Sequence, residues 1–150
     1  VPNTVCHVIN GIWNEKTAEM MAYRNLKVLI LGYKELRRGN EYIAAHDEAV
    51  ASNKKWLYNS LEKLIKRFKL ISFDNLAIEQ LNVKRLLSDA EWEEFYQGDD
   101  GTSTFYIDAI NQKFARSSTA AFDKRYPIDN LSMDEMFKII TDEYRKEKKK

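Results

Sequence analysis

The chain has 150 residues, of which 44% are hydrophobic and 31% are charged, so its composition is globular and excludes a disordered protein. A single cysteine excludes an intramolecular disulfide and indicates a reducing compartment, so we predict a cytoplasmic or otherwise intracellular protein. The net charge of +1 alone predicts no class of partner. Because prolines and glycines are few, we predict one all-α domain, residues 1–150, with about six to seven helices.

The first 13 residues differ in character from those that follow. They combine β-branched residues with an Asn10-Gly11 pair, a common hairpin turn, and so predict a short extended N-terminal arm. Asn14 can cap a helix, and apolar residues then recur at helical spacing through Leu26 and Leu29 to Leu36. We therefore predict a central helix that ends at Gly39-Asn40, weakened by Gly32 by about 1 kcal/mol relative to alanine.

Further helical segments are predicted over residues 41–51, 53–69 and 75–87. Ser88 with Glu91 and Ser132 with Glu135 form capping boxes, which predict two more helix starts. Residues 98–101 form the clearest loop. Apolar runs such as Val28–Leu31 have four residues, far short of the ~20 that a membrane helix needs, so no membrane span is predicted.

Charge is unevenly distributed along the chain. Residues 54–69 carry six bases against one acid, and residues 71–100 carry eight acids against two bases. In one interpretation these adjacent segments neutralise each other within the domain. In the other, the basic helix contacts nucleic-acid phosphates, which predicts binding that falls steeply with salt. A calmodulin target or an acidic membrane surface ranks lower, because the helix also has an apolar stripe suited to a core.

Residues 103–126 are predicted to form a helix-turn-helix. Residues 103–114 give a first helix, Ala115-Arg116 a tight turn, and Thr119–Arg125 a second, polar helix. With the capped helix that precedes it, residues 86–126 resemble the tri-helical DNA-binding modules of sigma-factor-like and phage regulatory proteins, which implies duplex binding. The turn lacks the glycine that many such motifs have, and Pro127 shortens the second helix.

No motif for catalysis or cofactor binding is present in the sequence. Cys6, His46 and Asp47 are the candidates for a nucleophilic site, but their context resembles no nucleophile elbow or thiol-protease signature. Zinc, di-iron, calcium and phosphate-loop spacings are missing too. We therefore predict no cofactor, no metal site and no small-molecule ligand, and find no positive support for an enzyme.

The leading hypothesis is a small nucleic-acid-binding or transcription-regulatory protein. The alternative is a protein–protein interaction module, such as an adaptor, inhibitor or assembly factor, without catalytic activity. For the first hypothesis the predicted contact residues, which share positive charge or a hydroxyl group, are Lys54, Lys55, Lys63, Lys66, Arg67, Lys69, Lys113, Arg116, Ser117, Ser118, Thr119, Lys124 and Arg125.

Overall fold

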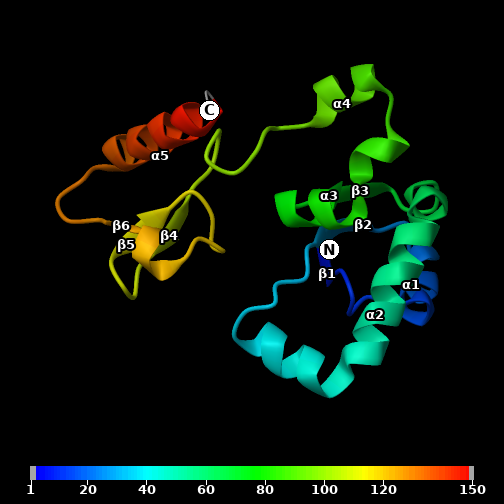
Figure 1. Ribbon diagram of the computed structural model, residues 1–150. Helices are drawn as coiled ribbons and strands as arrows, with labels where there is room; N and C mark the ends of the chain where they lie inside the picture. The colour runs from blue at the N-terminus through cyan, green and yellow to red at the C-terminus, as the bar shows by residue number, and fades with distance from the viewer. Residues whose placement is uncertain (1–2, 149–150) are drawn as a thin grey trace. The chain divides into compact units, whose positions relative to one another are not determined.

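The computed structural model describes residues 3–148 and contains both helices and two three-stranded sheets (Figure 1). The prediction of an all-α fold, and of a helical bundle, is therefore wrong. Contacts divide the chain into two compact units, Val1–Glu94 and Phe95–Lys150. Residues 1–2 of the predicted arm and residues 149–150 of the basic C-terminal tail lie outside the described part of the chain.

The first unit is a parallel sheet covered by helices. Its strands are β1 (Val5–Ile9), β2 (Lys27–Leu31) and β3 (Leu70–Phe73), which lie side by side in chain order. Helix α1 (Glu15–Ala22) connects the first two strands, and α2 (Arg38–Ile65) connects the second and third. A sheet that grows in one direction through crossovers of one hand carries all its helices on the same face.

One core holds these layers together. It includes Val28 and Ile30 of β2, Ala18 of α1 and Leu57 of α2, which are all fully buried. The predicted central helix at this position is wrong, because residues 27–30 pair with β1 on one side and β3 on the other. A strand inside a parallel sheet reads as a continuous apolar run, and such a run can imitate the spacing of a buried helix.

The helices that connect the strands begin only in part where the sequence predicted a helix cap. Asn14 caps α1 as predicted, and its side chain accepts a hydrogen bond from the Thr17 amide at 3.0 Å. Helix α2 joins the helices predicted at 41–51 and 53–69 into one, with a kink at His46, and ends at Ile65. After β3 come α3 (Asn75–Leu81), the short helix η1 (Val83–Leu86) and α4 (Asp89–Phe95).

The second unit pairs an antiparallel sheet with one long helix. Strands β4 (Tyr106–Asp108), β5 (Lys113–Ala115) and β6 (Tyr126–Pro127) lie in that order, and α5 is Met133–Glu147. Phe114, Met136 and Ile140 form its core. Ser132 and Glu135 cap α5 in the predicted box.

The helix-turn-helix prediction is wrong. Residues 103–114 form β4 and most of β5, and the stretch predicted as a recognition helix contains only the short helix η2 (Phe122–Lys124). Asn111 lies in the turn between the strands, where its amide and side chain both donate to Asp108. This side-chain satisfaction of a turn competes with a helix at the same position. The antiparallel strands β4 and β5 therefore form where the first helix and the turn were predicted.

Candidate protein interface

Among the residues that the structure describes in the first unit, the helices of the core pack on one face of the parallel sheet and leave the other face without a helix. Side chains of alternate residues along a strand point to opposite faces, and the strand register aligns them across the sheet. Val8, Ile30 and Phe73 form one row and pack toward the helices. The opposite face carries a set that we term the sheet-face surface: Val5, His7, Ile9, Lys27, Leu29, Leu31, Leu70 and Ser72.

This surface is apolar and accessible. Val5 is 41% exposed, Ile9 37% and Leu70 53%, and His7 is exposed beside them. Leu29 and Leu31 are half-buried between their neighbours and belong to neither core. Parallel sheets are normally covered on both faces, and a contiguous exposed apolar patch marks an interaction site. The sheet-face surface is therefore the candidate docking surface of the first unit.

The polar groups at the carboxyl ends of the strands serve the fold itself. Gln80 of α3 accepts from the Tyr33 amide and donates to the Tyr33 carbonyl, both at 2.9 Å. Its oxygen also accepts from Asn10 at 2.9 Å, while Asp74 accepts from the Gly32 and Ala77 amides. These bonds fasten α3 to the loops after β1 and β2, so they stiffen the sheet that carries the sheet-face surface.

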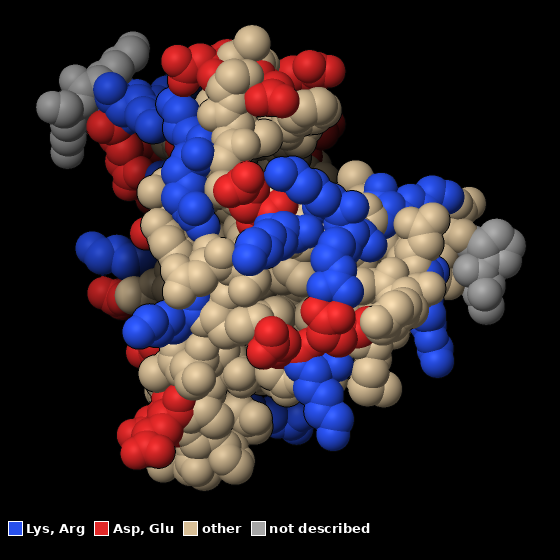
Figure 2. Space-filling model, turned by 90° about the vertical axis from the view of Figure 1, so that its right-hand side faces the viewer, with Lys and Arg blue, Asp and Glu red and all other residues tan. Residues whose placement is uncertain are grey.

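The predicted basic segment, residues 54–69, covers the end of α2 and the connection to β3, and it is partly neutralised. Lys54 pairs with Glu35 at 3.4 Å, Lys66 with Glu62 at 3.5 Å, and Arg67 with Glu19 of α1. The hydrogen bond from Arg67 holds the pKa of Glu19 below its ordinary value. Figure 2 shows one face of the molecule on which acidic side chains lie among the basic ones.

Three lysines of the same segment are different. Within the described chain, Lys55, Lys63 and Lys69 are exposed and take part in no ion pair. They are the members of this predicted set whose charge is directed only to solvent. Their role in nucleic-acid binding stays a prediction.

The predicted contact residues of 113–125 are largely engaged within the second unit. Arg125 donates to Asp108 at 2.7 Å and to two backbone carbonyls, with the two side chains only 11% and 7% exposed. Arg116 donates to Glu147 at 2.6 Å and to the Asp100 carbonyl at 2.5 Å. Lys113 lies over the Phe122 ring, 4.1 Å from its centroid. These bases act locally in folding.

The remaining four predicted residues lie at the surface of that unit. Ser117 and Thr119 bond to each other through their hydroxyl groups at 2.6 Å, in the turn that follows β5. Ser118 accepts from Arg125 through its carbonyl, and Lys124 is exposed. The two predicted basic segments belong to different units, residues 54–69 to the first and residues 113–125 to the second.

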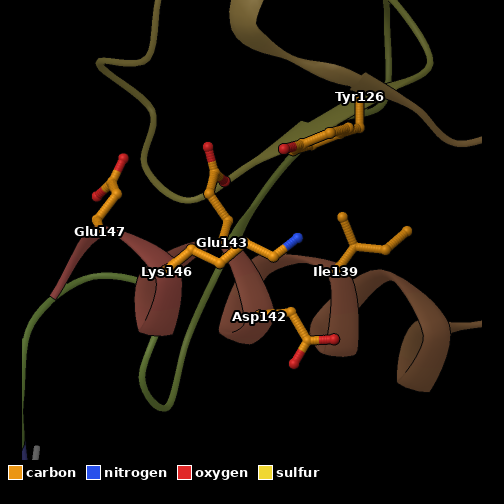
Figure 3. Close-up of a pocket in the computed structure, with 6 residues that line it drawn as sticks. All are labelled: Tyr126, Ile139, Asp142, Glu143, Lys146 and Glu147. Atoms are coloured by element: carbon orange, nitrogen blue, oxygen red, sulfur yellow. The ribbon is translucent and has the colours of Figure 1, made fainter. Parts of the chain in front are cut away.

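A pocket of about 370 Å³ lies between β6 and α5 (Figure 3). It is lined by Tyr126, Ile139, Asp142, Glu143, Lys146 and Glu147, and in Figure 3 Glu143 extends toward Tyr126 while Asp142 points away from it. Burial, and then the nearby Glu143 and Glu147 carboxylates, raise the pKa of Tyr126. Glu147 is already paired with Arg116, so part of this acidic lining is satisfied internally.

Sequence reasoning missed the sheet-face surface, although a signal for it was present. Val5–Ile9 is a short run with β-branched residues, bounded by the Asn10-Gly11 pair, which is the composition of a strand although its hydropathy does not alternate. Short β-branched or aliphatic runs then recur before Gly32 and before Asp74, each followed by a helix start. Three such strand-then-helix repeats predict a parallel sheet.

Among residues 3–148, no group of three His, Cys, Asp or Glu side chains is placed to hold a metal ion. The helices in that part of the chain also lack the length and apolar character required to cross a bilayer. Comparison with known proteins gives no match to a family model, a curated protein or a solved structure.

Proposed function

We propose that the chain is a protein–protein interaction module that binds a polypeptide through the sheet-face surface. The observation that supports this proposal is the uncovered apolar face of β1, β2 and β3. Covering it removes aliphatic side chains from water, at roughly 25 cal/mol per Å² of apolar area. The polar network of Gln80 and Asp74 holds the face rigid in advance, so little ordering opposes binding.

The test uses affinity capture with the full chain as bait and a matched pair of variants. Ile9→Lys places a charge on the sheet-face surface. Ile65→Lys makes the same change at the end of α2, where Ile65 is 40% exposed, nearly as much as Ile9. Proteins bound specifically, including a differently tagged copy of the chain, are expected to be lost with Ile9→Lys and kept with Ile65→Lys. Equal retention by both variants would contradict the proposal.

We also propose nucleic-acid binding as a second function, supported by Lys55, Lys63 and Lys69. Lys55 and Lys63 lie on α2 and Lys69 lies just before β3, and such exposed lysines suit phosphate contacts without base reading. Changing these three to Gln is expected to weaken duplex binding in a fluorescence anisotropy assay. The control changes Lys16, Arg24 and Lys138 to Gln, which alters the net charge equally. If the control weakens binding as much, the contact is not at α2.

A further inference from the structure

We infer that β1 binds an extended, uncharged segment of a partner protein, which pairs with its free edge as an added strand. The strands lie in the order β1-β2-β3, so β1 is at one edge of the sheet, and no other strand of residues 3–148 pairs with its outer side. The inference goes beyond the proposed function, because it concerns main-chain groups along the edge of the sheet, whereas the sheet-face surface consists of side chains.

The outer edge of β1 carries main-chain groups that the fold leaves without partners. Along a parallel pair, alternate residues direct both their amide and their carbonyl to the same neighbouring strand. The Asn10 amide donates to the Leu31 carbonyl of β2 at 2.9 Å, which fixes this alternation. The residues that direct their main-chain groups away from β2 are therefore Val5, His7 and Ile9. Within residues 3–148, nothing pairs with the amide and carbonyl of His7, the middle residue of β1.

This edge also lacks the features that normally protect an edge strand. Charged side chains, prolines and bulges prevent unwanted pairing at the edges of natural sheets. Residues 3–14 contain no Lys, Arg, Asp or Glu, and the register of β1 with β2 is unbroken from Val5 to Ile9. The other edge strand, β3, has Lys69 and Asp74 at its two ends and is contacted by α3. The edge of β1 is therefore the one that is open to a further strand.

The core beside β1 indicates the chemistry of the segment. Val28 and Ile30 of β2 are fully buried, whereas Cys6 and Val8, which pair with them on the same face, are only half-buried. An added strand would place its own side chains next to these two and complete the layer over the helices. The opposite face of β1 is aliphatic at its first and last residues, so a segment of β-branched or aromatic residues fits both faces.

A flexible segment suits this edge better than a folded second copy of the chain. Such a segment brings only its main chain and its alternating side chains to β1. A second copy that paired through its own β1 would also have to place its α1 beside α1 of the first copy. Main-chain hydrogen bonds provide the affinity in complexes of this kind, and the alternate side chains provide the specificity.

The experiment selects binders to the full chain from a phage-displayed library of random linear peptides, and the selected peptide is then synthesised. Its amide nitrogens are methylated one at a time. Because only every second residue of an added strand directs its amide to β1, methylation is expected to raise the dissociation constant about tenfold or more at alternate residues, and much less at the residues between. Side-chain binding without strand pairing would not give this alternation.

A matched pair of variants tests the edge from the side of the chain. His7→Pro removes the middle outward amide, at an edge position where proline is tolerated, and His7→Ala removes the same imidazole but keeps the amide. His7→Pro is expected to raise the dissociation constant of the peptide about tenfold or more, and His7→Ala to change it less than about threefold. Circular dichroism verifies that both variants are folded.

Amide hydrogen exchange in the wild type examines the same edge without a substitution. Saturation with the selected peptide is expected to slow exchange of the His7 amide about tenfold or more. Exchange of the Ile110 amide, in the second unit, should be unchanged. An unchanged His7 amide in the complex overturns the inference, even if His7→Pro does not fold.

Other results would overturn it as well. These are an equal effect of His7→Pro and His7→Ala, methylation effects without alternation, and no enrichment of peptides on the wild type relative to His7→Pro. A dimer of the free chain in sedimentation equilibrium that His7→Pro dissociates would show that a second copy occupies the edge instead. A partner that is lost with Ile9→Lys and kept with His7→Pro binds the sheet-face surface alone, which overturns this inference and leaves the proposed function in place.

Discussion

Arg125 was predicted to contact DNA, because it is a basic residue at the end of the predicted second helix. In the structure its guanidinium donates hydrogen bonds to the Asp108 carboxylate and to the backbone carbonyls of Ser118 and Ala120. Removing one partner of such a pair leaves an uncompensated buried charge, and that loss far exceeds the net contribution of the intact pair.

We therefore expect Arg125→Met to lower the free energy of unfolding by about 3–5 kcal/mol. Urea denaturation followed by circular dichroism measures this change. Lys124→Met is the matched control, because Lys124 is adjacent and exposed, and its effect should stay within about 0.5 kcal/mol. Similar effects of the two changes would show that Arg125 is not held as described.

Asp99 gives the second unit a pH dependence. Its carboxylate accepts hydrogen bonds from the Tyr96 hydroxyl and, at 3.0 Å, from the Tyr144 hydroxyl, and it pairs with Lys148. The hydrogen bond from Tyr96 is the main cause that lowers the pKa of Asp99 from its ordinary value of 3.8. A carboxyl whose pKa is lower in the folded chain stabilises the fold above its unfolded pKa, and this stabilisation is lost as the pH falls through the folded pKa.

The unfolding free energy of the wild type should thus fall more steeply below about pH 4 than that of Asp99→Asn. Denaturant titrations at a series of pH values measure the two slopes. Asp123→Asn changes an exposed carboxylate of the same unit and is expected to keep the wild-type slope. If Asp99→Asn also keeps it, the hydrogen bonds of Tyr96 and Tyr144 do not stabilise the charged carboxylate.

At the scale of elements, replacing Gly32 by alanine distinguishes the predicted helix from the observed strand, because the two structures predict opposite effects on stability. In an exposed helix, alanine at this position would raise the free energy of unfolding by about 1 kcal/mol. In the structure Gly32 follows β2, and an added Cβ would lie 2.4 Å from Leu76 Cγ and 2.8 Å from the Ala77 nitrogen. Overpacking of this kind costs about 1–3 kcal/mol.

Gly32→Ala is accordingly expected to destabilise the chain, with a sign opposite to that of the helix interpretation. The midpoint of urea denaturation reports the sign directly. Ala49→Gly in α2 calibrates the measurement, since glycine at an exposed helical position costs about 1 kcal/mol. A gain in stability on Gly32→Ala would contradict the placement of Leu76 and Ala77 against β2.

The elements that sequence predicted well are those fixed by local chemistry. The caps at Asn14, Ser88 and Ser132 need only a side chain and the amide three residues later, and all three are present. Strand β2 was missed because its partners are distant. Val28 pairs with Cys6 and with Ile71, and neither contact is visible in the spacing around it.

The candidate site likewise has features that the local sequence predicts and features that depend on distant residues. The composition of residues 5–9 favours a strand, and any strand places Val5, His7 and Ile9 on one face. That α1 and α2 both pack on the opposite face is a property of strand order, which a local pattern does not contain. The prediction of Arg116 and Arg125 as DNA contacts failed to anticipate Glu147 and Asp108, because long-range ion pairs leave no local trace.

For the whole molecule, salt distinguishes the two proposed functions. The net charge of +1 means that two copies repel each other only weakly at neutral pH, and that a neutral partner is not repelled. Association through the aliphatic sheet-face surface should therefore weaken little with NaCl, and strengthen in sulfate, which favours apolar burial. Phosphate contacts by Lys55, Lys63 and Lys69 release counterions, and three of them imply a slope of about −2.7 in log K against log salt for duplex DNA.

We accordingly expect a polypeptide complex to keep its dissociation constant within about threefold between roughly 0.05 and 0.5 M NaCl, while duplex binding through α2 would fall several-hundredfold over the same range. Sedimentation and fluorescence anisotropy measure the two reactions on the same preparation. Ile9→Lys serves as the control for the first reaction, and the triple change of Lys55, Lys63 and Lys69 to Gln for the second. The steep dependence must disappear in the triple variant and remain in Ile9→Lys. A polypeptide complex with an equally steep salt slope would show that charge, and not the aliphatic face of β1, β2 and β3, holds it together.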